Sequence, residues 1–167
     1  MDTSQENTQA IPSVEPQSEH RWLQRLVGEW TFELESTPGQ PEFTGSETVR
    51  ALGDIWYLAE GSHQVGDGKP HRSLMTLGFD PAKQRFVGTW FGSMMTHLWV
   101  YDGHLSEDGS ALNLDCEGPS MSGDGRMLPY RDVIELKSDD QRILRGLVRE
   151  DDGSWREFMV THYRRRT

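Results

Sequence analysis

Apolar and polar residues alternate at every second position along much of this 167-residue chain. The clearest cases are the stretch 30–35, WTFELE, and the stretch 112–116, LNLDC. A period of two places successive side chains on opposite faces of an extended strand. The alternation therefore predicts half-buried β-strands, each of which turns one face toward a core.

Turn signals separate these alternating segments roughly every 8–15 residues, which is typical of an antiparallel meander. The dipeptide Asp-Gly, which supplies the positive φ that hairpin turns need, occurs five times, at 67–68, 102–103, 108–109, 124–125 and 152–153. We expect nine or ten strands, at about 29–36, 42–52, 55–65, 72–80, 84–92, 96–105, 110–118, 128–138, 141–150 and 154–164. An open sheet of this length would leave two unpaired edges, so the predicted fold is a mainly-β, closed up-and-down barrel of about 8–10 strands.

One short helix is expected before the strands. Its apolar residues recur at helical spacing: Trp22, Leu23, Leu26 and Val27. Ser18 is a candidate N-cap and Gly28 a candidate C-cap, which predicts a helix over 19–27 that covers one end of the barrel. Residues 1–18 contain no Lys or Arg and few apolar side chains, so we expect a disordered leader followed by one barrel domain at 19–167.

Charge and composition exclude several classes of partner. The formal net charge of −10 would repel a phosphate backbone, so no nucleic-acid partner is expected. The chain has no apolar run of bilayer length, and its first residues lack the basic and apolar parts of a signal peptide, so we expect no membrane partner. Cys116 is the only cysteine, which rules out an intrachain disulfide. Together these features favour a cytoplasmic protein.

Two stretches resemble known barrels. Gly28-Glu29-Trp30 is similar to the G-x-W start of lipocalin-like (calycin) barrels, and this likeness implies that Trp30 packs at the closed end against Arg164 or Arg165 of the last strand. The stretch 78–103, with 114–119, 130–133 and the ending FMVTHYRRR, resembles a bacterial family of uncharacterised proteins with a lipocalin-like barrel. That resemblance covers about 19–166 and implies a fold without an established activity.

The segment 88–103, GTWFGSMMTHLWVYDG, is unusually aromatic. Alternation places His97, Trp99 and Tyr101 on one face of a strand, next to Trp90 of the strand before it. Buried ring N–H and O–H groups need polar partners, which favours a pocket over a filled core. We expect a small, largely apolar or aromatic ligand. The predicted ligand-binding residues are Glu60, Met75, Trp90, Met94, His97, Trp99, Tyr101 and Met159.

Two other classes of function stay open. One is a barrel enzyme of the isomerase, lyase or hydrolase type with Glu60 or His97 as base. The ionisable side chains considered for an inward position are Glu60, His63, Asp132 and Glu157. The other is a filled structural barrel whose main property is homodimerisation. No nucleophile motif is present, so no catalytic residue is assigned.

No metal or cofactor is predicted. The six histidines form no H-x-x-x-H or H-E-x-x-H motif. A metal site assembled from His63, His97 and His162, or a haem bound through His162, stays open as an alternative.

Overall fold

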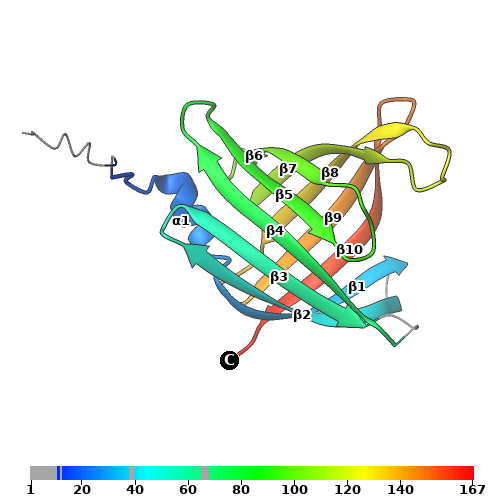
Figure 1. The fold of residues 1–167 in the computed structure, drawn as a ribbon, viewed down its shortest axis with the longest axis horizontal. Helices are drawn as coiled ribbons and strands as arrows, with labels where there is room; N and C mark the ends of the chain where they lie inside the picture. Colours follow the sequence, from blue (N-terminus) through cyan, green and yellow to red (C-terminus); the bar gives the residue numbers. More distant parts are fainter. Residues whose placement is uncertain (1–10, 12, 38–39, 65–67) are drawn as a thin grey trace, which may run out of the picture.

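The computed structural model describes residues 11, 13–37, 40–64 and 68–167. One short helix precedes ten strands that wrap into a barrel, with the helix against one end (Figure 1). The elements are α1 (Ser18–Gln24), β1 (Gly28–Thr37), β2 (Gln40–Leu52), β3 (Trp56–Gln64), β4 (Pro70–Asp80), β5 (Arg85–Gly92), β6 (Trp99–Leu105), β7 (Ala111–Pro119), β8 (Met127–Leu136), β9 (Gln141–Arg149) and β10 (Trp155–Arg165).

The strands form a closed antiparallel barrel in which each strand pairs with its neighbours along the chain. The first and last strands, β1 and β10, complete the ring through pairs such as Trp30 with Arg165 and Phe32 with Tyr163. Closure gives every strand a partner on both sides, so no long edge is left unpaired. The predicted fold class, a closed antiparallel barrel with one N-terminal helix, is confirmed.

Most predicted turns and strands agree with the structure. The glycines at 109, 125 and 153 adopt positive φ angles of 70°, 79° and 86° in turns between strands, as the Asp-Gly signal predicts. The Asp-Gly signal at 102–103 forms no turn: both residues lie inside β6, within the strand predicted at 96–105, and Asp102 pairs with Val87 on one side and Asp115 on the other. The Asp-Gly at 67–68 falls partly outside the described residues.

The helix differs from its prediction at both ends. It begins at Ser18 and ends at Gln24, and Gln17 is the N-cap in place of Ser18. The backbone N–H of Gln17 donates a hydrogen bond to Nδ1 of His20 at 2.9 Å, whereas the Ser18 hydroxyl donates to Glu19. Leu23 is fully buried, so the apolar side of α1 closes this end of the barrel.

The Gly-x-Trp start of β1 has a direct structural cause. Trp30 is fully buried, its indole N–H donates to the Leu26 carbonyl at 2.8 Å, and the Arg165 guanidinium lies 4.2 Å from its ring centre. Arg165 also donates to the Val27 carbonyl at 2.6 Å. Gly28, at φ 139°, leaves room for that guanidinium, because a β-carbon there would overlap Arg165 Nη1. The predicted contact between Trp30 and the last strand is present.

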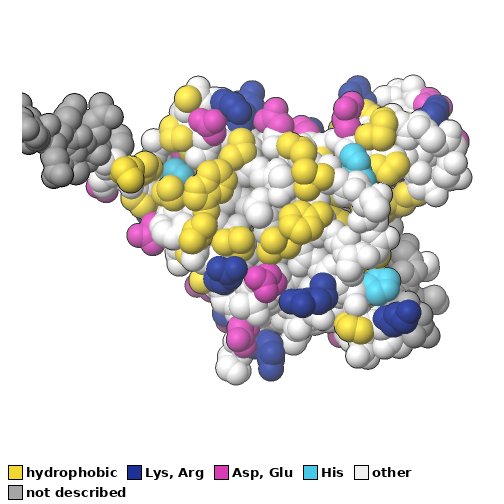
Figure 2. All heavy atoms as spheres, in the orientation of Figure 1, with side chains coloured by type: hydrophobic (Ala, Val, Ile, Leu, Met, Phe, Trp, Pro, Cys, Tyr) yellow, Lys and Arg dark blue, Asp and Glu magenta, His cyan; other side chains and the backbone are white. Residues whose placement is uncertain are grey.

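Apolar side chains also gather on the outside of the barrel. Figure 2 shows a band of hydrophobic atoms across the front face, where β3, β4 and β5 lie in Figure 1. Exposed large apolar residues include Trp56, Phe91, Leu98 and Val100. Within the described residues, no helix has both the length and the apolar character needed to cross a bilayer. The predicted leader lies mostly outside the described residues.

Candidate functional site

The barrel is not packed solid. A cavity of about 230 Å³ lies inside it, and none of the residues that line it comes from α1. Met95 and Met121, which belong to loops between strands and are exposed, also line the cavity, so its rim faces solvent. Aromatic rings make up much of the wall: Phe32, Phe43, Trp90, Trp99, Tyr101, Tyr130, Phe158 and Tyr163. The alternative of a barrel filled by its own side chains does not hold for the part of the interior that this cavity occupies.

Five of the eight predicted site residues line the cavity: Met75, Trp90, Trp99, Tyr101 and Met159. Strand register brings three of them together. Met75 on β4 pairs with Trp90 on β5, which in turn pairs with Trp99 on β6. Because directly opposed residues of antiparallel strands point to the same face, these side chains form one row along the inner wall.

Glu60, Met94 and His97 do not line the cavity. Glu60 lies between the buried, inward Ala59 and Gly61, so it points outward, where it forms an ion pair with Arg50 at 3.3 Å. The expectation that Glu60 supplies a polar group inside the barrel is therefore corrected.

His97 and Met94 belong to the segment before β6, which begins at Trp99 and not at 96. The backbone of this segment turns back, with the Met95 N–H donating to the Gly92 carbonyl at 3.3 Å. His97 does not line the cavity, but its ring meets the cavity-lining Trp99 edge-on with ring centres 4.8 Å apart, and its Nε2 lies 2.8 Å from the Glu117 carbonyl. The Met94 thioether packs beside Gly92.

Asp132 and Tyr101 form the most polar part of the cavity wall. The Tyr101 hydroxyl donates a hydrogen bond to Oδ2 of Asp132 at 2.6 Å. Burial raises the pKa of Asp132 to about 6, although this hydrogen bond favours the ionised form and opposes the rise. Burial, together with the nearby Asp132 charge, also raises the pKa of Tyr101 well above its usual range. Burial, with the charges of Asp132 and Asp115, raises the pKa of Cys116 to about 12.

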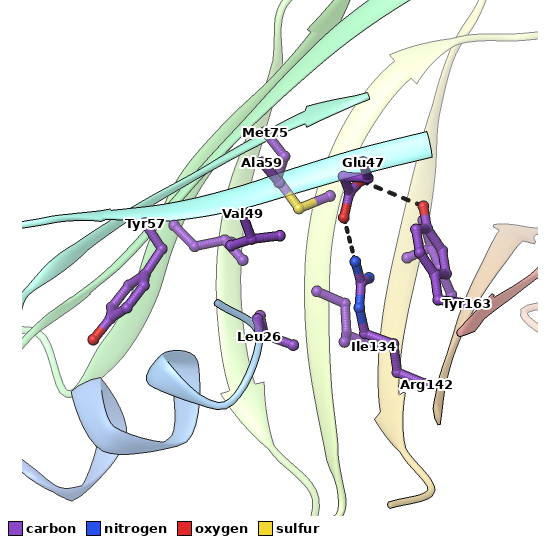
Figure 3. A pocket seen from close by; sticks show the side chains of 11 residues that line it. Leu26, Glu47, Val49, Tyr57, Ala59, Met75, Ile134, Arg142 and Tyr163 are labelled. Carbon is purple, nitrogen blue, oxygen red and sulfur yellow. Dashed lines mark hydrogen bonds and ion pairs between the residues drawn. The ribbon is translucent and has the colours of Figure 1, made fainter. Parts of the chain in front are cut away.

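A second polar cluster lies deeper, toward α1 (Figure 3). The Arg142 guanidinium pairs with Glu47, and the Tyr163 hydroxyl donates to the same carboxylate over 3.5 Å. Arg142 also lies between two rings, 4.7 Å from the centre of Trp30 and 3.8 Å from that of Tyr163. The cluster borders a separate void of about 20 Å³, the size of one water molecule. Burial and the adjacent Glu47 raise the pKa of Tyr163.

Sequence reasoning missed several wall residues for identifiable reasons. Glu47 and Arg142 carry charges that are typical of a surface, and only tertiary pairing shows that they are buried together. Strict alternation would place Phe158 and Met159 on opposite faces of β10, yet both line the cavity, because β10 contains a bulge between Glu157 and Met159. Gly118 was not predicted as part of the site. The Trp99 ring lies against its backbone, where any β-carbon would overlap the ring.

The histidines considered for a metal or haem do not converge. His63 lies in the cavity wall, stacked on Phe43 with ring centres 4.4 Å apart, and burial followed by the His71 charge lowers its pKa. His97 lies against Trp99 and the Glu117 carbonyl without lining the cavity, and His162 lies 3.8 Å from Glu35 on the outer face. In the part of the chain that the structure describes, no three potential ligands lie together as a metal site.

The ionisable residues considered for catalysis likewise do not all lie in the cavity. Glu60 and His97, the two proposed bases, both lie outside the cavity, and Glu157 forms an exposed ion pair with Arg145 at 3.1 Å. Of the four ionisable residues that the sequence suggested, His63 and Asp132 line the cavity.

These features define a ten-stranded antiparallel barrel, closed at one end by a helix, with a small aromatic cavity inside. The chain belongs to the family described as "Protein of unknown function (DUF1579)", which matches residues 15–165. The predicted membership of an uncharacterised family is confirmed at that level. A comparison with curated proteins finds no match.

A comparison with solved structures finds several similar chains. The crystal structure of Rv2717c from M. tuberculosis has a TM-score of 0.59 and 13% identity, and the match covers 92% of this chain and 100% of that one. The structure of EF1p2_mFAP2b bound to DFHBI has a TM-score of 0.47 and 15% identity, and the match covers 89% of this chain and 100% of that one. A de novo designed fluorescence-activating β-barrel has a TM-score of 0.46 and 16% identity, with 86% and 95% covered. At 13% identity, the similarity to Rv2717c supports a shared fold and carries no information about function.

Proposed function

We propose that this protein binds one small, largely apolar or aromatic molecule inside the barrel. The observation that carries the proposal is the cavity of about 230 Å³ with its aromatic wall. Pockets for drug-sized ligands usually measure about 300–1,000 Å³. The smaller volume here favours a compact molecule of one or two rings.

The lining supports binding in two ways. The row formed by Trp90 and Trp99 offers flat apolar faces on which a ring can stack. Met75 and Met159 add flexible, polarisable thioethers that adjust to the shape of a guest.

Blocking the cavity is expected to abolish binding of a neutral solvatochromic naphthalene dye, prodan. Ser73 lines the cavity and is half-buried, so Ser73→Trp would place an indole ring in the space that the dye needs. The measurement is a fluorescence titration at pH 7.5. We expect one saturable site in the parent protein and at least a tenfold weaker affinity in the variant, a change of about 1.4 kcal/mol or more.

Ser62→Trp is the matched control, because Ser62 lies next to the inward Gly61 and His63 on β3 and lines a hollow outside the cavity. It makes the same chemical change without occupying the cavity, so dye affinity should be retained. Equal affinity in the parent and Ser73→Trp proteins would show that the dye binds elsewhere and would contradict the proposal.

We retain the remaining sequence-based expectations as proposals. They are a leader at 1–18 distinct from a barrel domain at 19–167, kinship with bacterial lipocalin-like proteins, a cytoplasmic location, and no nucleic-acid or membrane partner.

A homodimer joined through an outer apolar face is supported by the exposure of Leu98 and Val100. Light scattering at several salt concentrations tests it, since a monomeric mass throughout would rule the dimer out.

A further inference from the structure

Several hydrogen-bond donors of the cavity wall already have acceptors within the protein. The hydroxyl of Tyr101 donates to Asp132, that of Tyr130 to the Pro119 carbonyl at 2.8 Å, and that of Tyr163 to Glu47. The indole N–H of Trp99 points to the Met95 sulfur at 3.2 Å. These four donors are therefore already occupied when a guest enters.

Asp132 holds the most available acceptor. Its Oδ2 atom accepts the hydrogen bond from the Tyr101 hydroxyl, whereas Oδ1 makes no hydrogen bond to any described residue. Among the described residues, Arg142 Nε is the only buried side-chain nitrogen or oxygen without a hydrogen-bond partner. Asp132 Oδ1 also has no partner, so it is not fully enclosed. Since Asp132 lines the cavity, Oδ1 is open to a molecule within it.

A charge count at pH 7.5 leaves one negative charge in the cavity. Glu47 and Arg142 cancel each other as an ion pair. Burial lowers the pKa of His63, so this side chain is uncharged at this pH, and the tyrosines and Cys116 keep their protons. The count covers the ionisable side chains that line the cavity, together with Cys116 and Arg142 beside them: Glu47, His63, Tyr101, Cys116, Tyr130, Asp132, Arg142 and Tyr163. The remaining charge is that of Asp132.

A carboxylate that has no cationic partner and is surrounded by aromatic rings can bind a cationic ligand. The faces of Trp, Tyr and Phe rings attract ammonium groups, and a carboxylate forms its strongest hydrogen bonds with charged donors. A carboxylate ligand is disfavoured, because the cationic Arg142 is already occupied by Glu47 and shielded by the rings of Trp30 and Tyr163.

We propose that the ligand of this barrel is a small aromatic or apolar amine, whose protonated nitrogen is held by Oδ1 of Asp132 while its apolar part lies against Trp90 and Trp99. This inference rests on the proposed function, since it names the class of molecule that the same cavity takes.

Three matched naphthalene compounds test the charge preference: 1-naphthylmethylamine, 1-naphthylmethanol and 1-naphthoate. Their affinities are measured by isothermal titration calorimetry at pH 7.5 with the full chain, Asp132→Asn and Asp102→Asn. Asp102→Asn removes the same charge from an exposed position on the outside of β6. We expect the amine to bind about tenfold more tightly than the alcohol in the parent and Asp102→Asn proteins.

In Asp132→Asn the affinities of amine and alcohol should fall within about twofold of each other. The alcohol, which binds without the charge, reports whether each variant keeps its cavity. If the alcohol binds and the amine is no tighter, or if its advantage survives in Asp132→Asn, the amine inference is wrong while ligand binding stands. Tightest binding of 1-naphthoate would also overturn it. If none of the three compounds binds, the proposed function itself fails.

Discussion

Replacing Arg142 by methionine is expected to lower the free energy of unfolding by about 3–5 kcal/mol. The Arg142 side chain is 4% exposed and its partner Glu47 is 12% exposed, so the substitution leaves a carboxylate buried without its cation. Methionine retains a long apolar side chain between the rings of Trp30 and Tyr163, and the loss therefore reports mainly the missing charge. Urea unfolding followed by tryptophan fluorescence measures it.

Arg50→Met is the matched control for this experiment. Arg50 pairs with Glu60 on the outer face, and its side chain is 58% exposed, so its removal should cost less than about 1 kcal/mol. The double variant Glu47→Leu, Arg142→Met should recover most of the loss, because no unpaired charge is then buried. Equal destabilisation by Arg142→Met and Arg50→Met would contradict a buried, mutually dependent pair.

Asp132→Asn is expected to stabilise the fold at pH 8 relative to the parent protein, and much less so at pH 4. The folded-state pKa of Asp132, about 6, lies above the ordinary aspartate value of 3.8. Between these values the folded protein keeps a proton that the unfolded chain releases, so this group's contribution to stability falls as pH rises through that window. Because asparagine does not titrate, the variant's advantage should grow by about 2–3 kcal/mol from pH 4 to pH 8.

The pH effect is read as the difference between variant and parent unfolding free energies, in which all other titrating groups cancel. Asp108→Asn supplies a control of opposite sign. The Ser106 hydroxyl, followed by the groups of Ser110, lowers the pKa of Asp108 to about 2, so its charged form supports the turn. That variant should lose stability relative to the parent as pH rises from about 2 to 3.8, and the difference should stay constant from pH 4 to pH 8. A pH-independent difference for Asp132→Asn would contradict a buried, proton-retaining carboxylate.

The barrel was predictable because its information is local. Alternation in stretches such as 30–35 and 112–116 sets which side chains face inward, and glycine turns at 109, 125 and 153 set where strands reverse. The failures have local causes as well. Asp102-Gly103 has the composition of a turn, but pairing with β5 and β7 keeps it in a strand. His97 was predicted within a strand by alternation, but it lies in the irregular segment between the turn at 93–94 and β6.

The site was predictable only where alternation continues without interruption. Met75, Trp90 and Trp99 form a row because three strands keep their register. Glu47 and Arg142 are 95 residues apart, and no spacing in the chain indicates that they meet. Asp132 was considered as an acid, but its partner Tyr101 comes from β6, which is not a hydrogen-bonded neighbour of β8. Contacts across the barrel depend on its closure and curvature, which local patterns do not encode.

The most direct test of a ligand site inside the barrel is a methyl NMR titration of protein labelled with ¹³C at the methionine methyl groups, using 1-naphthylmethanol. Met75 and Met159 line the cavity, whereas Met127 is 54% exposed and lines a groove on the outside. Binding in the cavity predicts saturable shifts of the Met75 and Met159 signals with the Met127 signal unchanged. Shifts confined to Met127, or no saturable shift at Met75 and Met159, would contradict it.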